Sequence, residues 1–203
     1  MSKRKQRKIL KTIEPVSYWY FLIATLISAS VAAWALRDNN LTALRLHNDL
    51  ISVDKSSGDV NTALNNLRQF TYAHMNTNLS SGPGTIYPPI QLQYTYQRLV
   101  SAEQARADAV NKQVYTDAES YCQNLIPTGF SGRGRVPCIE SYVTSHGTKA
   151  QPIPAALYEF DFVSPFWSPD LAGWAILTSI ILFICFIVRF VLEKWLKHNL
   201  KQH

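Results

Sequence analysis

Two long stretches of the chain contain only uncharged, mostly apolar side chains. Residues 17–36 form the first, between Pro15 and Arg37, and residues 171–188 form the second, between Asp170 and Arg189. Phe190, Val191 and Leu192 extend the second beyond Arg189, which gives a predicted span of residues 171–192. A helix of about 20 apolar residues crosses the hydrocarbon core of a bilayer, which is roughly 30 Å thick. The pattern therefore predicts two transmembrane helices in a chain of mainly α fold class.

Small side chains recur at four-residue intervals within both apolar stretches. They are Ala24, Ser28 and Ala32 in the first stretch, and Ala175 and Ser179 in the second. Such spacing lets two helices approach closely in a membrane. We expect transmembrane packing through these residues, either between the two helices of one chain or between neighbouring chains.

Tryptophan residues stand near both ends of each apolar stretch. Indole rings prefer the membrane–water interface, where part of the ring stays hydrated. We therefore expect five side chains to anchor the helices at the interface, namely Trp19, Trp34, Trp167, Trp174 and Trp195.

Between the two apolar stretches, leucine, alanine and valine recur with a helical period. The spacing predicts that the first helix continues to about residue 54 and that an amphipathic helix covers roughly residues 59–77. A third helix is expected from about Tyr96 to Leu125, stopped before Pro127. These helices can hide their apolar stripes against one another, so we expect an up-down helical bundle with long loops.

Loop composition and strict alternation mark the remaining segments of this region. Glycine and proline are frequent in residues 80–89 and 127–154, where we expect loops. Tyr158, Phe160 and Phe162 alternate with acidic residues, which indicates an extended segment with one aromatic face.

Positive charge is concentrated at the two ends of the chain. Residues 1–16 hold six Lys/Arg against one acid (+5), residues 189–203 hold four against one (+3), and residues 17–188 hold ten against twelve (−2), which sums to +6. Segments rich in Lys and Arg stay in the cytoplasm. We therefore expect the tails 1–16 and 193–203 to face the anionic inner leaflet of the plasma (inner) membrane, and residues 37–170 to lie outside it.

The basic tails and the first apolar stretch could also indicate nucleic-acid binding or a signal peptide. Nucleic-acid binding is not expected, because no aromatic or glycine pattern accompanies the charged tails. A cleaved signal peptide is the alternative for the first stretch, because Ala33-Trp34-Ala35 fits a cleavage site. The apolar run of about 20 residues, however, exceeds the usual 7–15 of such a peptide.

Two of the three cysteines lie in the predicted external region. Cys122 and Cys138 are 16 positions apart, and an even pair in an oxidising compartment predicts a disulfide bond. Cys185 lies within the second apolar stretch, where a thiol behaves as a small hydrophobe.

Candidate chemistry is sparse. The five histidines fit no metal-ligand spacing and no acid–base constellation is visible, so we expect neither a metal, nor a cofactor, nor an enzyme. Arg133 and Arg135 are candidates for contact with an anionic ligand, the alternative being two solvated loop arginines. An enzyme site in the loops would need these two residues to meet His146 and a carboxylate.

Two resemblances add to this picture. The segments "LNNLRQFTYAHMNTNLSSG" and "IYPPIQLQYTYQRLV" resemble small, uncharacterised two-span proteins of Saccharibacteria and related bacteria, over roughly residues 37–105. The order of tail, span, external helices and span is similar to the sensory half of bacterial chemoreceptors and sensor kinases. Only eleven residues follow Leu192, so we expect no kinase, adaptation or linker module.

The function that these patterns favour is a non-enzymatic integral membrane protein. Its external helical domain is expected to act as a binding, scaffold or sensory module, with a protein partner or a second copy of the chain completing it. The alternative is a structural subunit of a larger membrane or cell-envelope assembly, which associates through its transmembrane helices.

Overall fold

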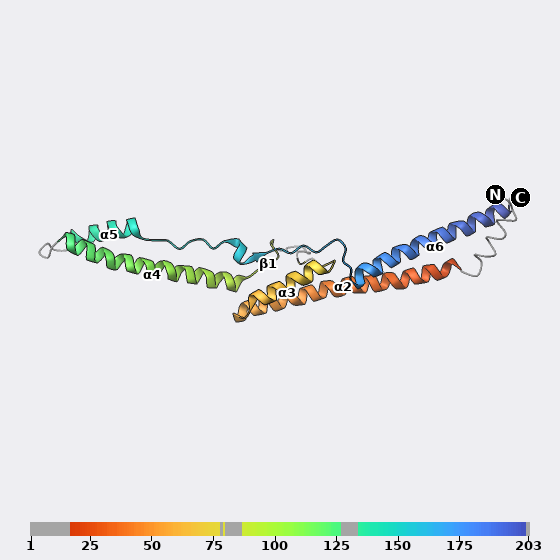
Figure 1. Ribbon diagram of the computed structural model, residues 1–203, viewed down its shortest axis with the longest axis horizontal. Helices are drawn as coiled ribbons and strands as arrows, with labels where there is room; N and C mark the ends of the chain where they lie inside the picture. Colours follow the sequence, from red (N-terminus) through yellow and green to blue (C-terminus); the bar gives the residue numbers. More distant parts are fainter. Residues whose placement is uncertain (1–16, 78, 80–86, 127–133, 202–203) are drawn as a thin grey trace. The chain divides into compact units, whose positions relative to one another are not determined.

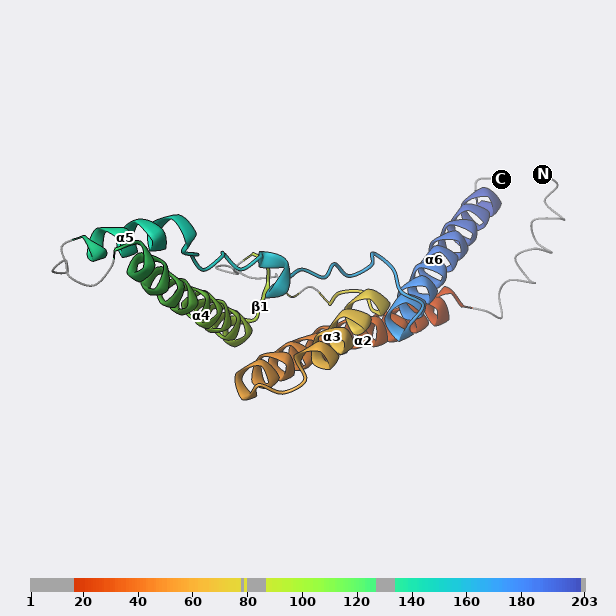
Figure 2. The same cartoon turned by 60° about the vertical axis from the view of Figure 1, so that its left-hand side comes forward.

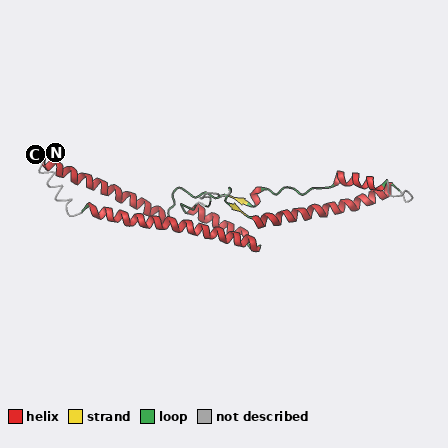
Figure 3. Cartoon of the chain, turned by 180° about the vertical axis from the view of Figure 1, so that it is seen from behind, coloured by secondary structure: helices red, strands yellow, loops and turns green. Residues whose placement is uncertain are grey.

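The computed structural model describes residues 17–77, 79, 87–126 and 134–201, and most of these are helical (Figures 1 and 3). This part of the chain contains α2 (Tyr18–Ser56), α3 (Val60–Ala73), β1 (Ile90–Gln91), α4 (Gln93–Leu125), α5 (Arg135–His146), a 3-10 turn η1 (Ala155–Leu157), β2 (Glu159–Phe160) and α6 (Leu171–Lys201). The predicted mainly α fold class is therefore confirmed.

The described residues belong to two compact units. The first takes its residues from Met1–Leu50, Val60–Thr85 and Phe162–His203, and so contains most of α2 with α3 and α6. The second takes them from Ile51–Asp59 and Ile86–Asp161, and contains the end of α2, the small sheet, α4 and α5.

Two helices of the first unit are long and apolar enough to cross a membrane. They are α2, with 39 residues, and Leu171–His198 of α6, with mean hydropathies of 1.7 and 2.7 over their most apolar windows. The bulky aliphatic side chains of α6 are exposed, and 6% of its apolar window is buried within the chain. The prediction of two such helices is confirmed at this level.

The faces that α2 and α6 turn to each other consist mainly of small residues. Ala32, Ala35, Ala172 and Ala175 are buried, and the Ser28 hydroxyl donates to the carbonyl oxygen of Ala175 at 3.0 Å. Tyr18, at the start of α2, meets the ring of Phe190 edge-on, with centroids 5.5 Å apart. The two helices therefore run antiparallel along the length of the first apolar stretch.

Helix α3 runs back beside α2 (Figures 1 and 2). Its Leu67 and Thr71 are buried, and the side-chain amide of Asn76 donates to the carbonyl oxygen of Leu36 at 3.0 Å. The helix ends at Ala73, four residues before its predicted end. Asn76 adopts a left-handed φ of 60°, and the Thr77 hydroxyl donates to the carbonyl oxygen of His74 at 3.1 Å, which closes the helix end.

In the second unit, α2 ends in a Schellman motif. Gly58 N–H donates to the carbonyl oxygen of Val53 at 3.0 Å, and Ser57 N–H donates to that of Asp54 at 3.4 Å. Ser57 takes the left-handed position with φ 58°. The predicted end of this helix, near residue 54, is thus close to the observed one.

A short antiparallel ladder pairs β1 with β2. Ile90 lies opposite Phe160 and Gln91 lies opposite Glu159, and Leu92 N–H donates to the carbonyl oxygen of Tyr158 at 2.8 Å. The segment predicted to be extended around Phe160 therefore does contain a strand, which the partner β1 fixes in place.

The expectation of loop throughout residues 127–154 is wrong, because α5 occupies Arg135–His146. Helix α5 lies beside α4 (Figure 1), and its Val136, Ile139 and Val143, at three- and four-residue spacing, line an open groove with Tyr115 of α4. Pro137 lies in the first helical turn, where its missing N–H breaks no hydrogen bond. The glycine and proline residues around this segment favoured a loop in the sequence.

Candidate functional site

The best-defined surface of the second unit lies on the helical pair formed by α4 and α5. Cys122 of α4 is fully buried and forms a disulfide bond with Cys138 of α5, with Cα atoms 6.0 Å apart. One turn further along α5, the ring of Tyr142 lies 5.3 Å from that of Tyr121. The predicted cysteine pairing is therefore present, and it joins two helices rather than a helix and a loop.

An open groove of about 570 Å³ follows this disulfide on one side of the helical pair. Tyr121, Leu125, Cys138, Ser141, Tyr142, Ser145 and His146 line it. None of these residues carries a permanent charge. The groove therefore combines aromatic faces with hydroxyl groups and one imidazole, without a counter-charge for an ionic ligand.

His146 is held in place within this groove. Its ring stacks on that of Tyr142 with centroids 4.2 Å apart, and its Nδ1 lies 3.0 Å from the carbonyl oxygen of Tyr142. The Ser145 hydroxyl also lies 2.9 Å from Nδ1, so this nitrogen has a hydrogen-bond partner in either tautomer. The ring is therefore oriented by its stack on Tyr142 and by these contacts to Nδ1.

A second groove, of about 390 Å³, lies on the other side of the same helical pair. Its lining is Tyr115, Val136, Ile139, Glu140, Val143 and Thr144. Tyr115 and Tyr121 are six residues apart on α4, which is about 120° around a helix. That angle explains why the two tyrosines line different grooves.

The chain that follows α5 is fastened along α4 by side-chain amide and carboxylate groups. Asn111 donates to the carbonyl oxygen of Thr148 at 2.9 Å and accepts from its N–H at 2.8 Å. Eight residues earlier on α4, Glu103 accepts from Gln151 N–H at 2.9 Å. Eight helical residues span about 12 Å and three extended residues about 10 Å, so residues 148–151 run antiparallel to α4.

Glu103 has an unusually acidic side chain. Arg106 binds it through two hydrogen bonds of 2.8 and 2.7 Å, which, together with the N–H of Gln151, lower the pKa of Glu103 to about 2. The carboxylate of Glu103 thus holds the chain near Gln151 against α4.

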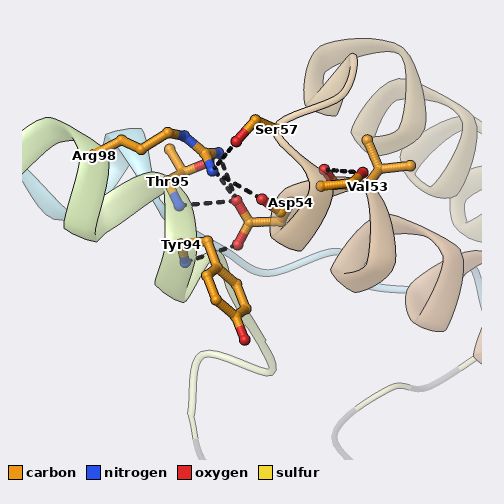
Figure 4. Close-up of polar contacts among 7 residues, drawn as sticks. Val53, Asp54, Ser57, Tyr94, Thr95 and Arg98 are labelled. Atoms are coloured by element: carbon orange, nitrogen blue, oxygen red, sulfur yellow. Dashed lines mark hydrogen bonds and ion pairs between the residues drawn. The ribbon is translucent and has the colours of Figure 1, made fainter.

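Asp54, in the last turn of α2, caps the first turn of α4 (Figure 4). Its buried carboxylate accepts from Tyr94 N–H at 2.9 Å and from Thr95 N–H at 2.8 Å. The guanidinium of Arg98 reaches the same carboxylate at 2.9 Å and the Asp54 carbonyl oxygen at 2.9 Å. Asp54 thus satisfies two of the free N–H groups at the start of α4, and this explains why α4 begins at Gln93, before the predicted Tyr96.

A second polar cluster lies in the first unit, where α6 begins. Asp170 accepts from Gly173 N–H at 2.9 Å and from the Asn39 amide of α2 at 2.7 Å. Partial burial alone would raise the pKa of Asp170, but these bonds, with one from Ser168, outweigh it and lower that pKa. Ser168 in turn accepts from Met75 N–H at 3.0 Å, so the cluster fastens α2, the end of α3 and the start of α6 together.

The predicted membrane residues all lie in the first unit. Ser28 contacts Ala175, and the hydroxyl of Ser179 donates to the same Ala175 oxygen at 2.8 Å. Ala32 is buried and Ala24 is half-buried. All five tryptophans are exposed, with Trp19 and Trp195 near one end of the helical pair and Trp34, Trp167 and Trp174 near the other.

Of the two candidate arginines, the structure describes Arg135, which lies far from His146 along α5. Arg133 lies outside the described residues. Arg135 is the first residue of α5 and lines neither groove, and eleven residues of helix separate it from His146, a distance of about 16 Å. Arg135 and His146 therefore cannot act on one small ligand.

Sequence reasoning missed several groups that fasten the second unit. Asp54, Glu103 and Asn111 each stand on a helix and bind backbone that is about 40 residues away. The sequence does show an acid near the end of a predicted helix, which can act as a cap. Neither its burial nor the helix that it caps can be identified from spacing. The groove residues did carry a signal, because Cys138, Tyr142, Ser145 and His146 recur at helical spacing.

Comparisons with family models, with curated proteins and with solved structures find no match to this chain. The fold and the site therefore define the class only as a mainly helical protein with two candidate membrane-spanning helices and a disulfide-linked helical pair. The resemblance to two-span Saccharibacterial proteins stays a prediction.

Proposed function

We propose that the chain is an integral membrane protein held by the first half of α2 and by α6, and that the disulfide-linked pair α4–α5 is its external binding module. The observation that carries the proposal is the apolar surface of α6, of which Ile180, Ile181, Phe183, Ile184, Ile187 and Val188 are exposed. Each such side chain costs about 1.5–3 kcal/mol when it remains in water. A bilayer removes that cost.

The positions of the tryptophans support the same proposal. Trp19 and Trp34 are 15 residues apart on α2, and Trp174 and Trp195 are 21 residues apart on α6. At 1.5 Å per residue these separations are about 22 and 31 Å, close to the thickness of a hydrocarbon core. The exposed indoles can therefore form one belt at each membrane surface.

The charge of the tails and the disulfide both support an orientation with the residues between the spans outside. Both tails are basic, which favours the cytoplasm for each, and the residues between the spans then lie outside. Cys122 and Cys138 form a disulfide bond, and such bonds persist in oxidising compartments. The charge of the tails and the disulfide thus favour the same orientation.

Part of the small-residue spacing in the two spans is used within one chain. Ser28, Ala32 and Ala175 are already used between α2 and α6 of one chain. The exposed side chains of α6 are mostly bulky and apolar, but on α2 the exposed Ala29 and Ala33 still offer a small-residue pair for association with another helix. We propose recognition on α4 and α5, in a scaffold or sensory role, and assembly through the Ala29–Ala33 face remains the alternative.

Single-cysteine labelling in intact cells tests this topology. In a Cys185→Ser background, we expect a membrane-impermeant maleimide to label Ala109→Cys on α4 before lysis and His198→Cys only after it. Alkaline carbonate should leave the protein in the membrane pellet. Release by carbonate would contradict membrane insertion, and the reverse labelling pattern would contradict the orientation.

A further inference from the structure

We infer that the groove lined by Tyr121, Tyr142 and His146 is a binding site for a neutral saccharide chain. The inference rests on the proposal that α4–α5 is a binding module and names the ligand class of that module. Its volume of about 570 Å³ lies within the range of small-molecule sites, roughly 300–1,000 Å³.

The lining selects against ionic ligands. All seven groove residues lack a permanent charge, while Glu140 lines only the groove on the other side. A charged ligand would leave water without a counter-charge, which is unfavourable. A neutral ligand with many hydroxyl groups loses less on entering such a site.

The arrangement of rings and polar groups fits a sugar. A pyranose ring has apolar C–H groups on its faces and hydroxyl groups around its edge. Tyr121 is 52% exposed and offers an aromatic face, whose negative charge density attracts C–H groups. Ser141 and the phenol groups can donate or accept, and the imidazole of His146 can donate to or accept from a sugar hydroxyl according to its tautomer.

The groove is also ordered before a ligand arrives. The disulfide fixes Cys138 against α4, and His146 is held by its stack on Tyr142 and by its Nδ1 contact. Side chains that are already immobilised lose little entropy on binding. A shallow open groove of this kind suits one part of a long polymer better than a whole small molecule.

Titration of the full chain in a detergent without a sugar head group tests the inference. The probes are tetra-N-acetylchitotetraose, maltotetraose and an uncharged alanine–glycine peptide, with isothermal calorimetry and saturation-transfer NMR as readouts. We expect at least one saccharide to bind with a dissociation constant on the order of 0.1–1 mM.

Matched variants locate the site. Tyr121→Ala should weaken saccharide binding by about tenfold or more, and Tyr121→Phe should retain most of it because the ring remains. Tyr115→Ala is the control, since Tyr115 lies on the same helix, is 53% exposed and lines the other groove. The intact disulfide and unchanged hydrogen exchange of α5 verify that each variant folds.

Three results would overturn the inference. They are the absence of saccharide binding at about 10 mM, binding of the peptide alone, and equal losses in Tyr115→Ala and Tyr121→Ala. This titration uses purified protein and does not depend on topology. If the titration fails and the cell labelling is as expected, the saccharide inference is wrong and the membrane proposal stands. If a saccharide binds and the labelling is not as expected, the saccharide inference stands and the membrane proposal is wrong.

Discussion

The interactions inside the first unit differ in kind from those inside the second. In the first unit, α2 and α6 meet through alanine and serine, and one polar cluster around Asp170 closes the end of the contact. In the second unit, a disulfide, an ion pair and side-chain bonds to backbone fasten α4 to its neighbours. The first unit exposes bulky apolar side chains on α6, whereas the second is linked by a covalent bond and by polar contacts.

The difference is visible on two helices of similar length. The 33 residues of α4 carry charged side chains along their exposed face, whereas the first eighteen residues of α6 carry none. A thin helical pair in water has little apolar surface to bury, so specific links must replace a core. This comparison predicts that perturbations should act on one unit and spare the other.

Loss of the disulfide should have the largest effect. Cys122→Ser combined with Cys138→Ser opens a loop of 16 residues and should destabilise the α4–α5 pair by about 3 kcal/mol. Hydrogen exchange followed by mass spectrometry should show faster exchange in α5 and unchanged exchange in α6. Cys185→Ser is the control, and equal protection of α5 in both variants would contradict the assigned role of the disulfide.

Removal of the Asp54 carboxylate should come next. Asp54→Ala frees Tyr94 N–H, Thr95 N–H and the Arg98 guanidinium, which should cost about 2 kcal/mol in the second unit. The first turn of α4 should exchange faster. The exposed Asp38 on α2 gives the control Asp38→Ala, and a first turn of α4 that exchanges equally slowly in both variants would show that the cap is dispensable.

Gly173→Ala should act on the first unit instead. A Cβ atom at this position would collide with the carbonyl oxygen of Ser168, so the start of α6 must shift, at a cost of about 1–2 kcal/mol. Thermal unfolding in detergent should report the loss. Gly134→Ala is the control, because its Cβ would lie 3.6 Å from Ile126 in ordinary contact; a midpoint unchanged in Gly173→Ala would refute the close approach.

The Glu103 carboxylate should give the smallest effect, as a pH dependence. Its pKa is about 2 in the folded protein against an ordinary 4.5, so its contribution is complete above pH 4.5 and is lost as the pH falls toward 2. Exchange at Gln151 N–H, corrected for its intrinsic pH dependence, should accelerate over that interval. Glu103→Gln should remove this dependence and Glu119→Gln on the same helix should not; a dependence that survives in Glu103→Gln would exclude this carboxylate.

Local pattern predicted most of the helices and some of the site. The absence of glycine and proline from Ser17 to Ser57 indicated the long helix α2. The pair of cysteines in the predicted external region indicated a disulfide. The helix α5 was missed because its stripe of Val136, Ile139 and Val143 is short and is surrounded by glycine and proline. An isolated helix of 12 residues is marginal in water, and the disulfide to α4 lies outside the reach of a periodicity argument.

The amino-acid sequence by itself determined where apolar stretches, basic tails and helices occur, because these depend on composition and on spacing along one element. Tertiary structure decided that Asp54 caps α4, that Asn111 and Glu103 hold residues 148–151, and that Tyr121 joins Tyr142 and His146 in one groove. Each of these contacts joins residues that are some 20 to 50 positions apart. Their pairing depends on how helices approach one another, and the local period of a sequence carries no information on that approach.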